Sequence, residues 1–341
     1  MTTKSLNVLY INHYDRSTDA ASISSYEIIG GLMSLGHKVI VLTNDPYPND
    51  EIEVSRTNVR FPIAAEKGSF LKFLRCTVAY FFVFLAGLRL CRRENIDCIF
   101  SQHHNFHLAT LTACMLSAFL GKPHIVKVQD VVPEAWGKGS LRRIYSRHFM
   151  GVLNEYALKR ATYILVLSQE QKDLLLKIFR ISKSQLVVAP NTISFFSVNS
   201  AKVKDVTKQL QLQSKKILIF VGSPEGRGVD VLIKALPQIT SDVSEVVLLL
   251  VGGGDNYKAL KDLSESTGVK DHVQFIGSVR HSLVSILISI CDVAIGPLFS
   301  FPSTVGAVPR KVLEYMACGK PVVSSYGSTS QDLLINGYNV I

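Results

Sequence analysis

The sequence predicts an α/β protein built from two open parallel-sheet domains in tandem. Strand-like apolar runs alternate with helix-like runs along nearly all of its 341 residues, a pattern typical of parallel strands joined by crossover helices. The alternation pauses in a polar stretch around residues 190–215 and then resumes. A hydrophobic content of 47% is sufficient for two cores. We therefore expect an N-terminal domain over residues 1–190 and a C-terminal domain over residues 191–341.

Each half of the chain begins with a strand and keeps the same rhythm to its end. In the first half the predicted strands cover residues 6–12, 37–43, 97–102, 124–130 and 162–168, and the predicted helices residues 22–35, 73–90, 107–120 and 141–160. In the second half the strands cover 216–222, 245–254, 273–277, 292–298 and 321–325, and the helices 228–236, 256–267, 281–290 and 309–318. Ligands of open parallel sheets bind beyond the carboxyl ends of the strands, so we expect a site in a cleft between the two domains.

The charge of the chain favours anionic partners. Its net charge is +10, and residues 1–190 hold 23 Lys and Arg against 15 Asp and Glu, while the rest hold 14 against 12. No zinc finger, aromatic RNA-binding motif or basic tail is present, so a nucleic-acid partner is not expected. Six scattered cysteines without a Cys-x-x-Cys pair, and no signal-peptide pattern after Met1, predict a cytoplasmic protein with reduced thiols.

An apolar segment in the first half has two interpretations. The thirteen residues between Arg75 and Arg89, "CTVAYFFVFLAGL", carry no charge and are bracketed by Lys72, Arg92 and Arg93. The segment is too short to span a bilayer, which takes about 20 apolar residues. It is either a helix buried against the sheet or a helix lying in a membrane interface, held there by its basic flanks. The second interpretation predicts peripheral association with an anionic membrane surface.

Residues 220–236, "FVGSPEGRGVDVLIKAL", combine a strand, a glycine-rich loop and a helix. Gly222, Gly226 and Gly228 allow a ligand to approach the backbone, and Arg227 with the helix N-terminus suits a diphosphate. The spacing matches neither the dinucleotide-binding fingerprint nor the P-loop, so an ordinary strand-to-helix turn is the alternative.

A second helix-turn-strand unit occupies residues 309–325, "PRKVLEYMACGKPVVSS". Pro309 suits a first helical turn, and Gly319 followed by Pro321 ends the helix. Glu314 is an acid one turn into this helix, and it needs either a partner or a ligand, unless it is a solvated surface residue.

The order of the motifs along the chain resembles glycosyltransferase family 4, the retaining sugar transferases of the GT-B fold. The motifs that carry the resemblance are "LGHKVIVLT" (35–43), "ATYILVLSQEQKDLL" (161–175), "VVAPNTIS" (187–194), the loop at 220–236, "LLLVGGGDNY" (248–257), "VQFIGSV" (273–279), "CDVAIGPL" (291–298) and the unit at 309–325. Within the family, "VQDVVPEAW" (128–136) and "PRKVLEYMACGKPVV" are most similar to the branch that builds bacterial surface polysaccharides. The resemblance implies an acceptor-binding domain at 1–190 and a nucleotide-sugar-binding domain at 191–341.

The resemblance also implies roles for individual residues. Glu314 corresponds to the glutamate that binds the ribose hydroxyls, the backbone around Ile276 and Gly277 to the part that meets the base, and Arg227 to a diphosphate-binding lysine. Further donor-site positions are Gly222, Ser223, Gly252 and Lys311, and the positions expected near the transferred sugar are Gln129 and Asp130.

Several positions depart from the family pattern. Gly306 stands where a second glutamate is frequent, Ser223 where an arginine is common and Gln129 where a histidine is usual. The Gly-Gly loop after the first strand is replaced by "DAASISS" (19–25). Because of these changes the sequence does not define the donor sugar. To a lesser degree, they also leave open the alternative of a chain without activity.

No metal or other cofactor is expected. His103, His104 and His107 have helix-compatible spacing, but their segment lacks a Cys, Asp or Glu partner, so we expect this strand end to line the acceptor site. Because no Asp-x-Asp motif occurs, cationic side chains and helix dipoles are expected to hold the donor diphosphate. We expect Lys311 to replace the charge lost at Ser223, with Arg310 pointing elsewhere; a plain Lys311–Glu314 surface pair is the alternative.

The predicted reaction is transfer of a sugar, with retention, from a nucleotide diphosphate sugar to a lipid-linked or oligosaccharide acceptor. One alternative is a non-catalytic GT-B subunit of a glycosyltransferase complex. The other is a Rossmann oxidoreductase, which the missing glycine fingerprint after the first strand disfavours. Because the chain ends just after "INGYNVI", we also expect the C-terminal domain to lack the further helices typical of the family.

Overall fold

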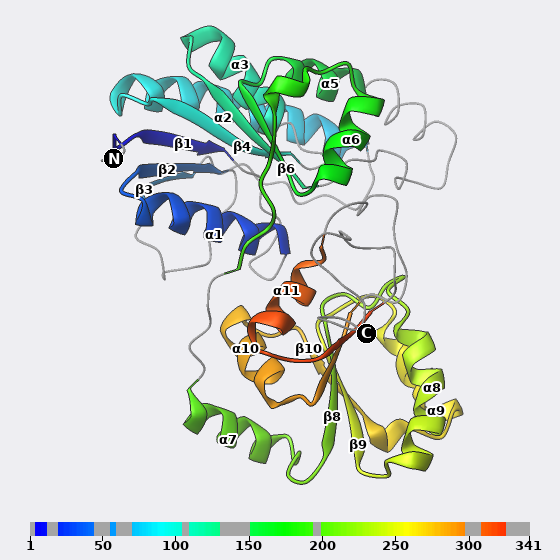
Figure 1. The fold of residues 1–341 in the computed structure, drawn as a ribbon. Coiled ribbons are helices and arrows are strands. Elements are labelled where there is room, and N and C mark those ends of the chain that lie inside the picture. Colours follow the sequence, from blue (N-terminus) through cyan, green and yellow to red (C-terminus); the bar gives the residue numbers. More distant parts are fainter. Residues whose placement is uncertain are drawn as a thin grey trace. The chain divides into compact units, whose positions relative to one another are not determined.

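The chain divides into two compact units, Met1–Pro190 (unit 1) and Asn191–Ile341 (unit 2), which Figure 1 shows as two α/β bodies. The structure is a computed structural model, and it describes residues 4–11, 20–43, 55–58, 70–103, 109–129, 151–193, 199–296 and 308–324. Each unit contains one sheet whose neighbouring strands all run parallel. The predicted pair of open parallel sheets is therefore confirmed.

Unit 1 is built on a seven-stranded sheet with the order β3-β2-β1-β4-β5-β6-β7. Its strands are β1 (Asn7–Ile11), β2 (Lys38–Thr43), β3 (Ser55–Asn58), β4 (Cys98–His103), β5 (His124–Val128), β6 (Tyr163–Val166) and β7 (Leu186–Val188). Its α-helices are α1 (Ala20–Ser34), α2 (Phe70–Arg93), α3 (Ala109–Leu120), α5 (Gly151–Lys159) and α6 (Gln169–Ile178).

Helices cover both faces of this sheet, which explains why its central strand β1 is apolar on both sides. In β1, Leu9 and Ile11 pack in a cluster with α2 and α3, whereas Val8 and Tyr10 pack in another cluster with Ile29 of α1. Successive side chains of a strand point to opposite faces, so both sets are buried. The short strand β3, which the sequence pattern did not indicate, extends the sheet beyond β2.

The apolar segment of α2 is buried on one side and exposed on the other. Val83 is 2% exposed within the core cluster that α2 shares with α3, and Gly87 lets α3 approach closely, because a Cβ there would lie 2.5 Å from Leu116. Phe81 and Phe82 are 59% and 44% exposed. The core interpretation is therefore correct for one face of the helix and leaves the other face open. No helix in the described ranges is long and apolar enough to cross a membrane.

Unit 2 is built on a five-stranded sheet with the order β10-β9-β8-β11-β12. Its strands are β8 (Lys216–Val221), β9 (Val246–Val251), β10 (Val273–Gly277), β11 (Val293–Ile295) and β12 (Val322–Val323). Its α-helices are α7 (Ser200–Gln209), α8 (Val229–Asp242), α9 (Tyr257–Ser266), α10 (His281–Ile290) and α11 (Arg310–Ala317). Alternating residues of β8 again pack against helices on opposite faces, α8 and α9 on one and α10 and α11 on the other.

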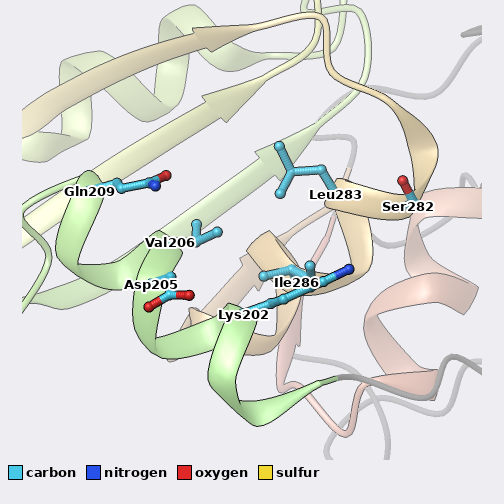
Figure 2. A pocket seen from close by; sticks show the side chains of 7 residues that line it. All are labelled: Lys202, Asp205, Val206, Gln209, Ser282, Leu283 and Ile286. Atoms are coloured by element: carbon cyan, nitrogen blue, oxygen red, sulfur yellow. The ribbon is translucent and has the colours of Figure 1, made fainter.

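The polar stretch around residues 190–215, where the alternation of strands and helices was expected to pause, contains helix α7, so that part of the prediction is wrong. Asn199 caps the helix, because its side-chain oxygen accepts hydrogen bonds from the N–H groups of Ala201 and Lys202 at 2.9 and 3.3 Å. The helix packs beside α10, and a hollow lies between the two helices (Figure 2). The hollow is lined by Lys202, Asp205, Val206, Gln209, Ser282, Leu283 and Ile286. Because no strand end contributes to it, it is not where a ligand of an open parallel sheet binds.

Candidate functional site

Three glycines stand at the carboxyl ends of three neighbouring strands of unit 2. Gly222 follows β8, Gly252 follows β9 and Gly277 ends β10, with φ angles of +106°, +137° and +77°. They are joined by backbone hydrogen bonds, from the Gly222 N–H to the carbonyl of Val251 at 2.7 Å and from the Gly252 N–H to the carbonyl of Gly277 at 2.8 Å. A Cβ on Gly252 would lie 2.3 Å from the carbonyl oxygen of Gly222. The row therefore exposes backbone along the sheet edge in a form that requires glycine at this position.

The end of β10 carries a bulge at another predicted position. The register of β10 on β9 shifts between Phe275 and Gly277, so Ile276 is the extra residue. Behind it, the Tyr257 ring packs edge-on against Phe275 at 5.4 Å between ring centroids. Bulges redirect side chains and backbone at the ends of strands, and this one leaves Ile276 out of the ladder while Gly277 stays paired with Val251.

Lys311 reaches from α11 to the first glycine of the row. Its Nζ lies 3.8 Å from the centroid of the Phe220 ring, and it would lie 3.1 Å from a Cβ on Gly222. Burial and, to a smaller extent, the Arg227 guanidinium together lower the pKa of Lys311 to about 7, while the Glu314 carboxylate opposes the shift. The cation–π contact with Phe220 helps to hold this ammonium group at the strand end. Lys311 therefore lies at the glycine-rich loop, close enough to Arg227 for the two charges to interact.

The loop that carries Arg227 is tightly folded. The Arg227 N–H donates to the carbonyl of Pro224 at 3.2 Å, and Gly228 caps α8 in the left-handed region with φ at +79°. The hydroxyl of Ser223 donates to the carboxylate of Glu225, whose other oxygen accepts from the N–H of Asn256 at 3.3 Å. Ser223 is thus bound within the loop and adds no positive charge to it.

Glu314 is a buried carboxylate held by two basic side chains. Its side chain is 5% exposed, and its Oε1 lies 2.9 Å from Nε of Arg310 and 3.0 Å from Nε2 of His281. The expectation that Arg310 points elsewhere is wrong, because one turn of helix places it at i,i+4 spacing from Glu314. The helical partner of Glu314 is thus Arg310 rather than Lys311. The interpretation of Glu314 as a solvated surface residue is also wrong.

Helix α11 is anchored so that these side chains keep their places. The hydroxyl of Tyr315 accepts from the N–H of Val221 at 2.9 Å and donates to the carbonyl of Ile295 at 3.2 Å, which ties the helix to β8 and β11. Gly319, with φ at +66°, ends the helix as predicted, and its N–H donates to the carbonyl of Met316 at 2.9 Å. The helix therefore presents Lys311 and Glu314 from a fixed base.

At the corresponding edge of unit 1 the strand ends carry neutral polar side chains. Gln129 follows β5, and its Nε2 donates to Oγ of Ser24 on α1 at 2.9 Å. The hydroxyl of Ser25 donates to Oε1 of Gln102, at the end of β4, at 2.8 Å. Both strand ends are therefore joined to the start of α1 by hydrogen bonds. The second predicted residue of this group, Asp130, lies outside the described residues.

The histidine cluster is described in part. His103 is buried, and its Nδ1 lies 3.3 Å from Oγ1 of Thr110, while His104 and His107 lie outside the described residues. In the described ranges no group of three or more His, Cys, Asp or Glu side chains is arranged to hold a metal ion. Gly306, the position of the missing second glutamate, also lies outside these ranges.

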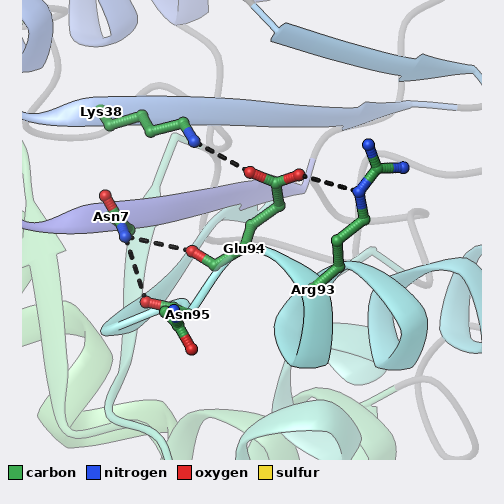
Figure 3. A network of polar contacts seen from close by, with 5 residues as sticks. All are labelled: Asn7, Lys38, Arg93, Glu94 and Asn95. Atoms are coloured by element: carbon green, nitrogen blue, oxygen red, sulfur yellow. Dashed lines mark hydrogen bonds and ion pairs between the residues drawn. The ribbon is translucent and has the colours of Figure 1, made fainter.

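At the opposite, amino end of the unit 1 sheet, charged and amide side chains form a network of polar contacts (Figure 3). Glu94 accepts from Nζ of Lys38 at 2.8 Å and pairs with Arg93 at 3.3 Å, and Asn7 donates to the backbone carbonyls of Glu94 and Asn95 at 3.1 and 3.2 Å. These contacts join the end of α2 to β1 and β2. Because these polar groups bind one another, we assign the network a structural role.

His281 is the site residue that the sequence reasoning missed. It begins α10 directly after the β10 loop, 33 positions before Glu314 in the chain, so no local spacing connects the two residues. A polar residue at the first position of a helix that follows a parallel strand is the one available signal, because such positions lie at the edge where ligands bind.

Comparisons with known proteins agree with this fold. The family model for glycosyltransferase family 4 matches residues 21–195, and that for glycosyl transferases group 1 matches residues 203–341. Among solved structures, Anabaena HepE in complex with UDP and glucose is 17% identical with a TM-score of 0.71, covering 98% of this chain and 85% of that chain. WaaG, a glycosyltransferase involved in lipopolysaccharide biosynthesis, is 18% identical with a TM-score of 0.68, covering 95% of this chain and 82% of that one. These likenesses confirm the GT-B fold.

A curated relative covers most of the chain. It is one of the subunits of the phosphatidylinositol N-acetylglucosaminyltransferase of Arabidopsis thaliana, and it is 22% identical over 300 residues, which are 86% of this chain and 61% of that protein. The chain spans between 45% and 61% of the length of the first curated relatives that it matches. Because the family 4 match alone extends over just more than half of the 341 residues, the chain belongs to glycosyltransferase family 4.

Proposed function

We propose that the protein transfers a sugar, with retention, from a nucleoside diphosphate sugar to a glycan acceptor. The observation that carries the proposal is the arrangement at the strand ends of unit 2, where Lys311 and Glu314 extend from one helix beside a row of three glycines. A cationic group and a carboxylate one turn apart suit a ligand that carries a diphosphate next to a diol. The HepE complexes with UDP and with UDP-glucose support the choice of ligand class.

In this proposal different residues bind different parts of the donor. Glu314 accepts hydrogen bonds from the ribose hydroxyls, and the backbone at Ile276 and Gly277 meets the base. Lys311 and Arg227 bind the diphosphate, together with the exposed backbone at Gly222 and Gly252. Their positive charge stabilises the diphosphate as it leaves, when its negative charge increases. Ser223 keeps the loop folded through its bond to Glu225.

The proton state of Lys311 matters for this role. A lysine with a pKa of about 7 is partly neutral at physiological pH, and a bound diphosphate favours its charged form. Donor binding is therefore accompanied by proton uptake near pH 7 to 8. We assign the binding of the diphosphate to cationic side chains, with no metal ion required, and the environment of the reacting sugar to Gln129 and Asp130.

Two substitutions test the donor site. Lys311→Met should weaken binding of UDP or GDP about tenfold to a hundredfold while leaving uridine or guanosine binding nearly unchanged, because only the diphosphate contacts the lysine. Glu314→Gln should weaken binding of both the nucleoside and its diphosphate. Isothermal titration calorimetry on the full chain measures these affinities. Equal small losses for Lys311→Met across nucleoside and diphosphate would show that the lysine serves only the helix.

The acceptor in this proposal is lipid-linked, and unit 1 contacts an anionic membrane surface. Exposed apolar side chains occur on α2, α3 and α5, where α3 packs against both other helices, and in this proposal they act together as one apolar face: Phe81, Phe82, Met115, Phe119, Val152 and Tyr156. Arg89, Arg92 and Arg93 on α2 are exposed, and each basic group near anionic lipid contributes about 1 kcal/mol. The Arabidopsis relative, whose name refers to phosphatidylinositol, supports a lipid acceptor.

A vesicle experiment tests the membrane contact. The protein should co-sediment with vesicles containing phosphatidylglycerol, less with pure phosphatidylcholine, and less at high salt. Phe81→Ser combined with Phe119→Ser should reduce the binding severalfold, whereas Leu35→Ser, which removes a side chain equally exposed at 66% but outside this face, should not. Binding that ignores lipid charge, salt and the double substitution would contradict the proposal.

A non-catalytic subunit of a glycosyltransferase complex is the second candidate. The name of the Arabidopsis relative identifies that protein as one subunit of its transferase, and three positions of this chain depart from the family pattern. Measuring nucleotide-sugar binding and turnover separately distinguishes the two candidates. Tight donor binding without transfer to any acceptor or to water, restored to transfer by a partner protein, would favour the subunit.

A further inference from the structure

His281 contacts the carboxylate to which the proposed function assigns ribose recognition. We propose that His281 is a positioning residue: together with Arg310 it holds Glu314 by Oε1 and so directs Oε2 at the 2′,3′-diol of the donor. This inference rests on the proposed function and adds to it a residue that determines how selectively the site recognises ribose.

The two donors reach the same oxygen from different elements. Arg310 is the first residue of α11 and lies one turn before Glu314, whereas His281 is the first residue of α10. Their nitrogen atoms lie 2.9 and 3.0 Å from Oε1, and the side chains of Arg310, His281 and Glu314 are 10%, 27% and 5% exposed. The contact is therefore largely shielded from water, where hydrogen bonds to a carboxylate fix geometry most strongly.

Two donors on one oxygen determine how the carboxylate is oriented. A carboxylate oxygen has two lone-pair sites, and Oε1 uses both for Arg310 and His281. The terminal torsion of a glutamate side chain has a broad, roughly two-fold preference, so the backbone does not define which way the carboxylate plane turns. Arg310 by itself leaves the group free to rotate about the Arg310–Oε1 contact. The second donor, from a different helix, removes that freedom and presents Oε2.

The contact is not needed to join the two helices. Val284, Leu287 and Ile288 of α10 already pack in one core cluster with Val312 and Tyr315 of α11. Loss of the His281 side chain therefore leaves the helix pair in place. Its expected consequence is a change in which ligands Glu314 selects.

The test compares each nucleoside diphosphate with its own 2′,3′-dideoxy analogue. The probes are UDP, GDP and ADP, titrated calorimetrically into the full chain, and the readout is the affinity ratio of the hydroxylated to the dideoxy form. The wild type should prefer the hydroxylated form. His281→Ala should reduce this ratio about tenfold, equivalent to about 1.4 kcal/mol, with little change for the dideoxy ligand. His281→Gln, whose side-chain N–H can take the place of Nε2–H, should restore most of the ratio.

Two further variants separate positioning from general damage. The double variant Glu314→Gln with His281→Ala should have the same affinity ratio as Glu314→Gln alone, because no carboxylate is left for His281 to orient. His272→Ala is the matched control, since His272 bonds to the carbonyl of Val246 at 2.8 Å, at the amino end of β9, and should leave the ratio unchanged.

The outcomes distinguish this inference from the proposed function. If the wild type binds none of the three diphosphates, or binds them without preferring the hydroxylated form, the assignment of the ribose to Glu314 is wrong. If the wild type shows the preference and His281→Ala keeps it, or loses affinity for both forms equally, His281 has only a structural role and the inference is overturned.

Discussion

The residues at the carboxyl edge of the unit 1 sheet differ in chemistry from those at the carboxyl edge of the unit 2 sheet. In unit 2 the strands end in glycines with positive φ, and cationic side chains lie beside them. In unit 1 the ends of β4 and β5 carry Gln102 and Gln129, joined by hydrogen bonds to serines of α1. Exposed backbone with positive charge suits a ligand that bears phosphate, whereas neutral donors and acceptors suit a ligand that bears hydroxyl groups.

The difference extends to the buried basic groups. In unit 1 burial lowers the pKa of His124, at the start of β5, to about 3, so this side chain stays neutral under all physiological conditions. In unit 2 burial lowers the pKa of Lys311 to about 7, so its charge responds to pH and to a bound anion. A buried base at a strand's amino end is part of the core, while one at the carboxyl end is positioned to change charge with a ligand.

The largest effect that sharpens this comparison is expected at a glycine. Gly252→Ala should lower the free energy of unfolding of unit 2 by about 3 kcal/mol or more, because the new Cβ meets the Gly222 carbonyl at 2.3 Å and the φ of +137° disfavours any side chain. Denaturant unfolding monitored by circular dichroism measures the loss.

The matched control for this prediction lies in a helix of unit 1. Gly30 stands in α1 without a positive φ, and nothing lies within 4 Å of the place that a Cβ would take there. Gly30→Ala should therefore stabilise the protein, by up to about 1 kcal/mol, because alanine is the better helix former. Similar effects of the two substitutions would mean that the glycine row is not a constrained part of unit 2.

The next effect concerns pH and Lys311. Its pKa is about 7 in the folded protein and 10.5 ordinarily, so between these values the unfolded chain binds more protons and the free energy of unfolding rises with pH. Below pH 7 the buried lysine is charged in both states and its destabilising effect is complete. Lys311→Met should therefore be more stable than the wild type at pH 6, and the advantage should shrink as the pH approaches 10.

Urea unfolding of both proteins at pH 6, 8 and 10 measures this difference. All other titrating groups are shared, so the change in the gap between the two proteins reports on Lys311. A gap that stays constant across this range would mean that Lys311 titrates near its ordinary pKa and that its ammonium is well solvated. Since the same substitution is expected to weaken diphosphate binding, a more stable but weaker-binding variant would indicate a residue kept for its ligand.

The sequence predicted the fold better than it predicted the side-chain contacts. Alternation of apolar runs identified most of the strands and helices, because both faces of each sheet are covered and every central strand must be apolar. It did not indicate β3, whose sequence Ser-Arg-Thr-Asn has no apolar pattern, α6, the short strand β7, or α7, which lies in the polar stretch where the alternation pauses. An edge strand and a helix on the surface depend on tertiary neighbours more than on periodicity.

At the site, local spacing worked only where both partners lie on one element. The i,i+3 relation of Lys311 and Glu314 could be read from the chain, and Lys311 does reach the glycine loop. The same reasoning placed Arg310 elsewhere, although i,i+4 spacing equally allows the ion pair that forms with Glu314. His281 could not be found in this way, because its contact depends on how α10 packs beside α11.

The smallest expected effect tests whether unit 1 handles the neutral partner of the reaction. Gln129→Ala should leave the affinity for UDP or GDP unchanged and should lower the rate of transfer, because Gln129 belongs to unit 1, whereas all the proposed diphosphate contacts belong to unit 2. Its loss also removes the bond from Nε2 to Oγ of Ser24, so we expect a decrease of about 1 kcal/mol in the free energy of unfolding. Ser24→Ala should show the same loss of stability with a smaller loss of transfer.

Gln185→Ala is the control for this comparison. Gln185 also lies in unit 1 and donates from Nε2 to the carbonyl of Lys159 at 3.2 Å, but it precedes β7, at the amino edge of the sheet. Its substitution should lower stability by more than Gln129→Ala does, because the Gln185 side chain also donates to the carbonyl of Ala161 and accepts from the N–H of Ser182, and it should leave transfer unchanged. If instead Gln129→Ala weakened diphosphate binding as strongly as Lys311→Met, the two edges would share one ligand group and the division between a charged and a neutral edge would be wrong. Binding and transfer measurements on Gln129→Ala, Gln185→Ala and Lys311→Met therefore decide whether the two sheet edges bind separate substrates.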